Sequence, residues 1–149
     1  MPGSNILSLK SMLHSTLSTQ LATRGTFVGI DFGTSTTVVS IATKENGEEK
    51  INTLPIKLTQ ILEDGTIYQS EKLPSVIAWY NEKLLVGEGA SNLKYTLIKG
   101  KNIWFSFKME IGEDLGAKYY NSEVSTMEGV KIRNPKDCVR VFFMYLNIL

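Results

Sequence analysis

The chain has 149 residues, of which 42% are hydrophobic and 21% are charged, as expected for a globular domain and not for a disordered chain. Sixteen basic and fifteen acidic residues leave a net charge of +1, which gives no electrostatic basis for binding nucleic acid or an anionic membrane. One cysteine and one histidine exclude an internal disulfide and a zinc cluster. No apolar run is long enough to span a bilayer. Because the single cysteine cannot form an internal disulfide, we expect a reduced, cytoplasmic protein.

Residues 1–26 differ from the rest and are expected to form an N-terminal extension, either disordered or helical. The first 24 residues are rich in Ser, Thr and Leu, contain no acid, and carry Lys10 and Arg24. Leucines and Ile6 recur every three to four residues, which is typical of an amphipathic helix. An organellar leader is the functional alternative to a loosely ordered extension.

Three strands are predicted after the extension, forming a β-meander. The run Phe27-Val28-Gly29-Ile30 predicts a buried strand, and Thr37 to Ile41 is rich in β-branched residues. Asn46-Gly47 predicts a hairpin turn. Ile51 to Leu58 predicts the third strand.

The middle of the chain predicts a polar connection and then two short strands. Residues 59–73 form the connection, around Asp64-Gly65. Ser75 to Tyr80 and Lys83 to Val86 follow as strands, joined at Asn81-Glu82.

The last third alternates between helix and strand signals. Ala90, Leu93, Leu97 and Ile98 predict a helix closed by Gly100. Strand propensity is strong from Ile103 to Phe107, and a strand pair is expected to turn at Glu128-Gly129. A closing helix begins with Asn134 as N-cap and Pro135 in the first position, with an apolar face that is formed by Val139, Phe142, Phe143 and Leu146. It has no stop signal, so we expect the chain to be cut short there.

The turn Asp31-Phe32-Gly33-Thr34-Ser35-Thr36 carries the chemistry that the sequence predicts. Gly33 allows a close backbone approach, and successive N–H groups of such a turn can hold phosphate oxygens. The hydroxyls of Thr34, Ser35 and Thr36 add donors. Asp31 can hold hydrated Mg²⁺, which takes few protein carboxylates. The alternative is that these residues only close a hairpin.

Two other phosphate motifs are excluded. A protein-kinase Asp-Phe-Gly motif needs an His-Arg-Asp loop, and the one histidine, His14, stands outside any such loop. A Walker loop, Gly-x-x-x-x-Gly-Lys-Ser/Thr, is absent.

The segment 28–39 resembles the first phosphate motif of the actin, hexokinase and heat-shock ATPase superfamily. The stretches Leu73 to Trp79 and Leu85 to Ala90 resemble later blocks of the seventy-kilodalton heat-shock chaperones, the DnaK-like proteins. Phe107-Lys108-Met109-Glu110-Ile111-Gly112 resembles their Ala-Lys-Arg-Leu-Ile-Gly stretch, and this likeness implies helix where propensity favours strand. The connection between Leu58 and Leu73 is longer than is usual in that family.

The resemblance assigns roles to individual residues. It implies that Asp31 holds Mg²⁺ through water, and that Gly33, Thr34, Ser35 and Thr36 surround the β- and γ-phosphates of ATP. Lys108 matches the lysine that helps to position the attacking water. Asp31, Thr34 and Lys108 are therefore the predicted catalytic residues. For Lys108 the alternative is a solvated surface lysine.

The resemblance also implies an α/β fold of the actin-like ATPase type. Residues 27–149 would form one ribonuclease-H-like lobe with a small inserted subdomain, truncated at its C-terminus. The expected function is the ATP-binding portion of a chaperone ATPase, inactive alone, with ATP or ADP, a second lobe, peptide clients and co-chaperones as partners. The alternatives are an actin-like filament or shape-determining protein, or a non-catalytic nucleotide-binding remnant.

Overall fold

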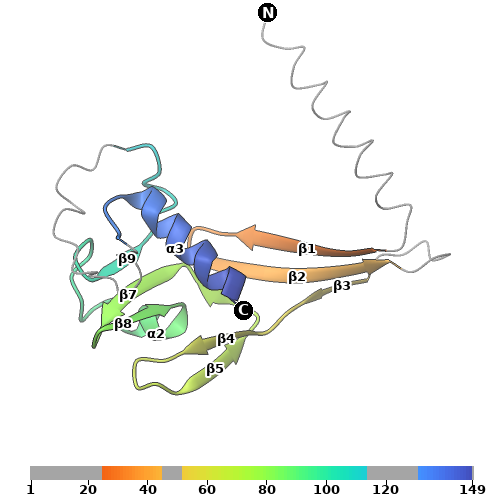
Figure 1. Cartoon of the computed structure of the whole chain (residues 1–149), viewed down its shortest axis with the longest axis horizontal. Helices are drawn as coiled ribbons and strands as arrows, with labels where there is room; N and C mark the ends of the chain where they lie inside the picture. The colour runs from red at the N-terminus through yellow and green to blue at the C-terminus, as the bar shows by residue number, and fades with distance from the viewer. Residues whose placement is uncertain (1–24, 45–51, 114–130, 149) are drawn as a thin grey trace, which may run out of the picture. The chain divides into compact units, whose positions relative to one another are not determined.

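The computed structural model describes residues 25–44, 52–113 and 131–148 (Figure 1). In these residues the expected α/β lobe is mostly β, with antiparallel sheets and two helices. The contacts divide the chain into two units, Met1–Gly29 with Val39–Pro55 and Ile30–Val38 with Ile56–Leu149. The predicted extension lies outside the described residues as far as residue 24.

The first sheet has the strand order β1-β2-β3, and β6 also pairs with β2. Its strands are β1 (Gly25–Phe32), β2 (Thr36–Lys44), β3 (Asn52–Pro55) and β6 (Leu73–Pro74). β2 is antiparallel to β3 from Ser40↔Pro55 to Thr43↔Asn52, as a meander requires. The predicted turn at Asn46-Gly47 lies outside the described residues.

The predicted strand over residues 27–30 is confirmed, but its predicted burial is wrong. Val28 is 67% exposed and Ile30 is 45% exposed. β1 lies at an edge of its sheet and has β2 as its hydrogen-bonded neighbour. A short apolar run predicts a strand, but it does not specify how many faces of that strand are covered.

The third predicted strand, from Ile51 to Leu58, is wrong as a single element. β3 ends at Pro55, and a new strand, β4 (Leu58–Ile61), begins three residues later. Proline has no N–H to donate to a ladder, so it favours the end of a strand.

The predicted polar connection over residues 59–73 contains a hairpin of β4 and β5 (Ile67–Ser70). Its turn holds Gly65 at φ 89°, a conformation that favours glycine. Asp64 Oδ1 accepts a hydrogen bond of 2.8 Å from the Thr66 N–H. Hydrogen bonding by Thr66 lowers the pKa of the Asp64 carboxyl.

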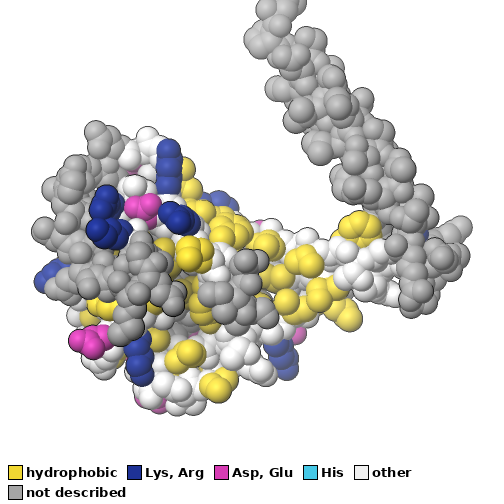
Figure 2. Space-filling view, viewed as in Figure 1, with side chains coloured by type: hydrophobic (Ala, Val, Ile, Leu, Met, Phe, Trp, Pro, Cys, Tyr) yellow, Lys and Arg dark blue, Asp and Glu magenta, His cyan; other side chains and the backbone are white. Residues whose placement is uncertain are grey.

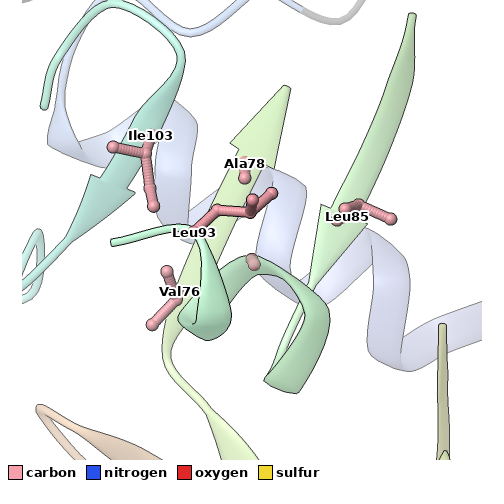
Figure 3. Packing of buried hydrophobic residues seen from close by; sticks show 6 residues of the cluster. Val76, Ala78, Leu85, Leu93 and Ile103 are labelled. Atoms are coloured by element: carbon pink, nitrogen blue, oxygen red, sulfur yellow. The ribbon is translucent and has the colours of Figure 1, made fainter. Parts of the chain in front are cut away.

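A second sheet of order β8-β7-β9 contains the core, with strands β7 (Val76–Tyr80), β8 (Lys83–Val86) and β9 (Ile103–Phe105). The predicted tight link between β7 and β8 is confirmed: Asn81 and Glu82 have φ of 48° and 58°. The predicted helix near residue 90 is shorter than expected, as α2 spans Glu88–Asn92. Figure 3 shows labelled side chains of β7, β8 and β9 around α2 and Leu93. The buried cluster comprises Val76, Ala78, Leu85, Ala90, Leu93 and Ile103.

Residues 103–113 begin as a strand, as their propensity predicts, and then form a series of turns. β9 confirms the strand signal, so the helix implied by the resemblance is wrong at Ile103–Phe105. After β9 the backbone makes consecutive turns, with N–H bonds from Met109 to Ser106 O and from Glu110 to Phe107 O. Trp104 and Phe107 are buried.

The closing helix α3 spans Pro135–Ile148, as predicted. Asn134 Oδ1 accepts from the Asp137 N–H at 2.9 Å, and Asp137 Oδ2 accepts from the Arg133 N–H at 2.9 Å. The first bond satisfies a donor in the first turn of the helix, and the second holds the residue before the N-cap against that turn. The strand pair predicted near Glu128-Gly129 lies outside the described residues.

The buried face of α3 differs from the predicted one. Cys138, Val141 and Phe142 are buried, whereas Phe143 is 37% exposed. The buried face is therefore rotated about the helix axis relative to the predicted one, towards Cys138 and Val141 and away from Phe143. Burial raises the pKa of the Cys138 thiol, and the charges of Asp137 and Glu110 raise it further.

Gln60 on β4 is fully buried and holds two chain segments together. Its Nε2 donates to Lys72 O at 3.0 Å, and its Oε1 accepts from the Glu88 N–H, the first residue of α2, at 2.8 Å. Gly87 faces this amide so closely that an added Cβ would lie 2.3 Å from Gln60 Oε1. One side chain thus fixes the hairpin against α2.

We predict that Gln60→Ala lowers the free energy of unfolding by roughly 2–4 kcal/mol, because two part-buried backbone groups lose their partners and the buried side chain leaves a cavity. Urea denaturation followed by circular dichroism measures the change. The matched control is Gln69→Ala on β5, whose exposed side chain donates to Thr59 Oγ1, at 3.3 Å. Equal losses in the two variants would contradict this role for Gln60.

Candidate functional site

The turn between β1 and β2 is tight and leaves no room for a side chain at Gly33. The Gly33 N–H donates to Thr36 O at 3.1 Å and approaches Asp31 O at 3.2 Å. A Cβ built on Gly33 would lie 2.3 Å from Thr36 O, well inside contact distance. The close approach that the sequence predicts at this glycine is therefore made, first of all, to the chain's own backbone.

Ser75 holds this turn from the other side. Its N–H donates to Ser35 O at 2.9 Å, and its hydroxyl donates to Gly33 O at 3.0 Å. The Thr37 hydroxyl lies 3.2 Å from Ser75 Oγ. Because the single proton of Ser75 is given to Gly33, Thr37 must be the donor in that pair. β6 reaches this position by pairing Leu73 with Thr37 in β2.

The resemblance covers Ser75, but sequence reasoning missed its role at the site. The hydroxyl is 2% exposed and forms a buried bond that joins residues 42 positions apart in the chain. A serine after a proline is a common turn pattern, so nothing in its neighbours indicates such a partner. The signal that could have found it is the lone hydroxyl in a run that is otherwise apolar.

Several polar groups of the turn remain available to a ligand. Within the described residues, the backbone N–H groups of Thr34 and Ser35 have no acceptor, whereas that of Gly33 is used inside the turn. The Asp31 side chain is exposed next to them. No cluster of three or more metal-binding side chains occurs in the described part of the chain, so Asp31 would act as a single carboxylate.

Lys108 reaches the turn from a distant segment, after the strand β9. Its Nζ donates to the backbone carbonyl of Phe32, and it lies 5.0 Å from the centroid of the Phe32 ring. The ammonium has three protons, so this contact leaves it able to donate to a further acceptor. The structure thus places Lys108 beside Asp31 and Gly33, which directly flank Phe32.

The ring of Phe32 lies among aromatic side chains of two segments, the turn that follows β9 and the helix α3. Its centroid is 5.5 Å from that of Phe142, 5.1 Å from Phe143 and 6.5 Å from Phe107. Distances of this size suit tilted and edge-to-face contacts between rings. α3 and the segment that carries Lys108 therefore both pack against the Phe32 ring. Sequence reasoning missed this contact.

An ion pair fixes the segment that carries Lys108. Glu110 is 8% exposed, and its Oε1 lies 2.9 Å from Lys99 Nζ. Lys99 also lies 4.7 Å from the centroid of the Phe105 ring. The sequence departs here from the Arg-Leu of the chaperone stretch, and the charge of Glu110 is compensated by Lys99. Asp114, the neighbouring acid, lies outside the described residues.

All six predicted site residues lie in one unit of the structure. Asp31, Gly33, Thr34, Ser35 and Thr36 form the turn, and Lys108 contacts it through Phe32. The arrangement joins an acid, free amide donors, hydroxyls and an ammonium at one place. Such a set can hold an anion together with a hydrated cation.

Neither the models of known protein families nor the curated proteins contain a match to this chain. No helix within residues 25–44, 52–113 and 131–148 has the length and apolar character needed to cross a membrane.

We predict that Gly33→Ala lowers the free energy of unfolding by about 1–3 kcal/mol, because the new methyl group would collide with Thr36 O. Gly29→Ala on β1, the strand that precedes the turn, is the matched control. Its Cβ would meet only Ser40 O, at 3.9 Å, an ordinary contact, so we expect a change below about 0.5 kcal/mol. Chemical denaturation of both variants tests this; a larger loss for Gly29→Ala would refute the packing argument.

Proposed function

We propose that this chain carries the phosphate-binding part of an ATPase similar to the DnaK-like chaperones. The fold would be one ribonuclease-H-like lobe of an actin-like ATPase, with the region around α2 as its inserted subdomain. In this proposal ATP and ADP are the ligands, and a second lobe, peptide clients and co-chaperones are the partners. The cytoplasm is the compartment that suits this function.

The contact of Lys108 with Phe32 is the observation that carries the proposal. Two stretches that resemble separate chaperone blocks stand 76 residues apart, and their polar groups meet at one turn. Most lysines of a protein are solvated, so a lysine that donates to this carbonyl supports a role at the site. The Ser75 bonds add support, because they join the second block to the first.

Each residue has a defined part in the proposed reaction. The N–H groups of Thr34 and Ser35, with the hydroxyls of Thr34, Ser35 and Thr36, would bind phosphate oxygens of ATP. Asp31 would hold Mg²⁺ through water, and the ion, when bound, neutralises charge on the phosphates. The Lys108 ammonium would stabilise the charge that develops when water attacks the γ-phosphate.

We predict that Mg-ATP binds weakly to this chain and shifts the amide resonances of Thr34 and Ser35 in NMR spectra. Removing Mg²⁺ should weaken the binding, and Asp31→Asn should abolish that dependence on Mg²⁺, because the amide cannot replace the carboxylate. Asp64→Asn, at another exposed turn, is the matched control and should behave as the wild type. Unchanged spectra at millimolar Mg-ATP would refute the proposal.

We predict that Lys108→Ala, in a form of the protein that hydrolyses ATP, lowers kcat by about 10²-fold or more and leaves nucleotide binding nearly unchanged. The matched control is Lys57→Ala, since Lys57 is an exposed lysine on the link between β3 and β4. Steady-state ATPase assays and calorimetry separate the two effects. Full turnover in Lys108→Ala would mean that the lysine only packs against Phe32. Nucleotide-dependent polymers in sedimentation would favour the filament protein instead.

A further inference from the structure

The side of α3 opposite its buried residues is basic in its first half and apolar in its second half. Lys136, Arg140 and Met144 recur at every fourth position and Phe143 lies beside Met144, so these exposed side chains leave the helix on one side. Arg133, exposed just before the helix, stands three positions before Lys136. These residues form the outer face of α3.

The three cations of the outer face lack acidic partners. None of them forms an ion pair within the described residues, where the ion pair joins Lys99 to Glu110. Asp137, at the edge of the face, is the one acid of α3, and its Oδ2 accepts the Arg133 N–H. The helix dipole disfavours cations near the first turn, so helix stability does not explain Arg133 and Lys136. The face therefore carries positive charge that an acidic partner would neutralise.

Apolar side chains lie directly beside this charge. Phe143 is 37% exposed and Met144 is 42% exposed. Figure 2 shows Lys and Arg side chains gathered over the start of α3, with apolar side chains next to them. The Phe143 ring meets the rings of Phe32 and Phe142 edge to face, which fixes its position. Charge and a packed apolar surface thus lie together, about 16 Å apart along the helix from Arg133 to Met144.

We propose that the outer face of α3 binds an acidic segment of another protein. Its carboxylates would pair with Lys136 and Arg140, and the guanidinium of Arg140 can bond a carboxylate through two N–H groups. An apolar side chain of the same segment, about one helical turn further along, would cover Phe143 and Met144.

The apolar half of the face selects a protein segment over two other anionic partners. Nucleic acid would neutralise the cations through its phosphates but would leave Phe143 and Met144 uncovered. A membrane takes up apolar side chains that protrude into it. More than half of each of these two side chains is already covered by the protein itself, so they suit a lateral contact instead.

The proposed contact is small, and its charges are exposed. The binding is therefore weak, and high salt weakens it further. It does not rest on the proposed ATP site, because no residue of the outer face is among the predicted site residues.

Fluorescence anisotropy with a labelled synthetic peptide tests the proposal on the whole chain. The peptide repeats the spacing of the face: two glutamates four positions apart, then two leucines three and four positions after the second glutamate. One control peptide has glutamine in place of glutamate, and another has serine in place of leucine. The first control should bind roughly tenfold more weakly, and the second about threefold more weakly.

Charge variants show whether the outer face is the binding surface. Lys136→Glu and Arg140→Glu should each raise the dissociation constant of the glutamate peptide roughly tenfold, because an attractive pair becomes repulsive. The variant with both changes should instead bind a peptide that has lysine in place of glutamate. Lys83→Glu, at an exposed lysine of β8, is the matched control and should bind as the wild type. Thermal unfolding shows whether each variant is folded.

Several outcomes would overturn the proposal. They are equal binding of the glutamate and glutamine peptides, no binding of the glutamate peptide at millimolar concentration, and charge variants that bind as the wild type. Tighter binding to duplex DNA, or to vesicles of phosphatidylserine and phosphatidylcholine, would assign the face to those partners. In NMR spectra the peptide should shift amide resonances of α3 and leave those of Thr34 and Ser35 unchanged, which separates this surface from the ATP site.

Discussion

The buried hydroxyl of Ser75 is the constraint on which the candidate site depends. It ties the carbonyl of Gly33 to the link between β6 and β7, 42 positions later in the chain, and the N–H of Ser75 ties the carbonyl of Ser35. With the Gly33 N–H bonded to Thr36 O, the turn has partners on both of its sides. A phosphate-binding turn needs its donors held in advance, since ordering them upon binding would cost conformational entropy.

Phe32 extends this constraint to the rest of its unit. Its carbonyl receives Lys108, and its ring contacts Phe107 and two phenylalanines of α3. Phe32, which separates Asp31 from Gly33, therefore packs against the other rings and also holds the charge of Lys108 beside the turn. Placement of the Lys108 ammonium depends on this ring and on the Lys99–Glu110 ion pair behind it. Any movement of α3 along Phe32 would reach the turn directly.

Local signals in the sequence predicted the parts of the fold that depend on neighbouring residues. The cap at Asn134, the tight link at Asn81-Glu82 and the start of β2 all follow from short-range backbone preferences. The exposure of β1, the break after Pro55 and the face of α3 depend on which distant element covers each residue. At the site, the residues from Asp31 to Thr36 were sufficient to predict the turn. The role of Ser75 could not be predicted in this way, because its hydrogen-bond partner, Gly33, lies in another segment of the chain.

The departures from the chaperone resemblance lie around the turn and not within it. Glu110 replaces an apolar residue, yet its charge is matched by Lys99, so the segment keeps its position under Lys108. The hairpin of β4 and β5 lengthens a connection, yet Gln60 and the Tyr145 bond to Thr59 anchor it without using any group of the turn. A site held by its own backbone bonds tolerates such changes nearby.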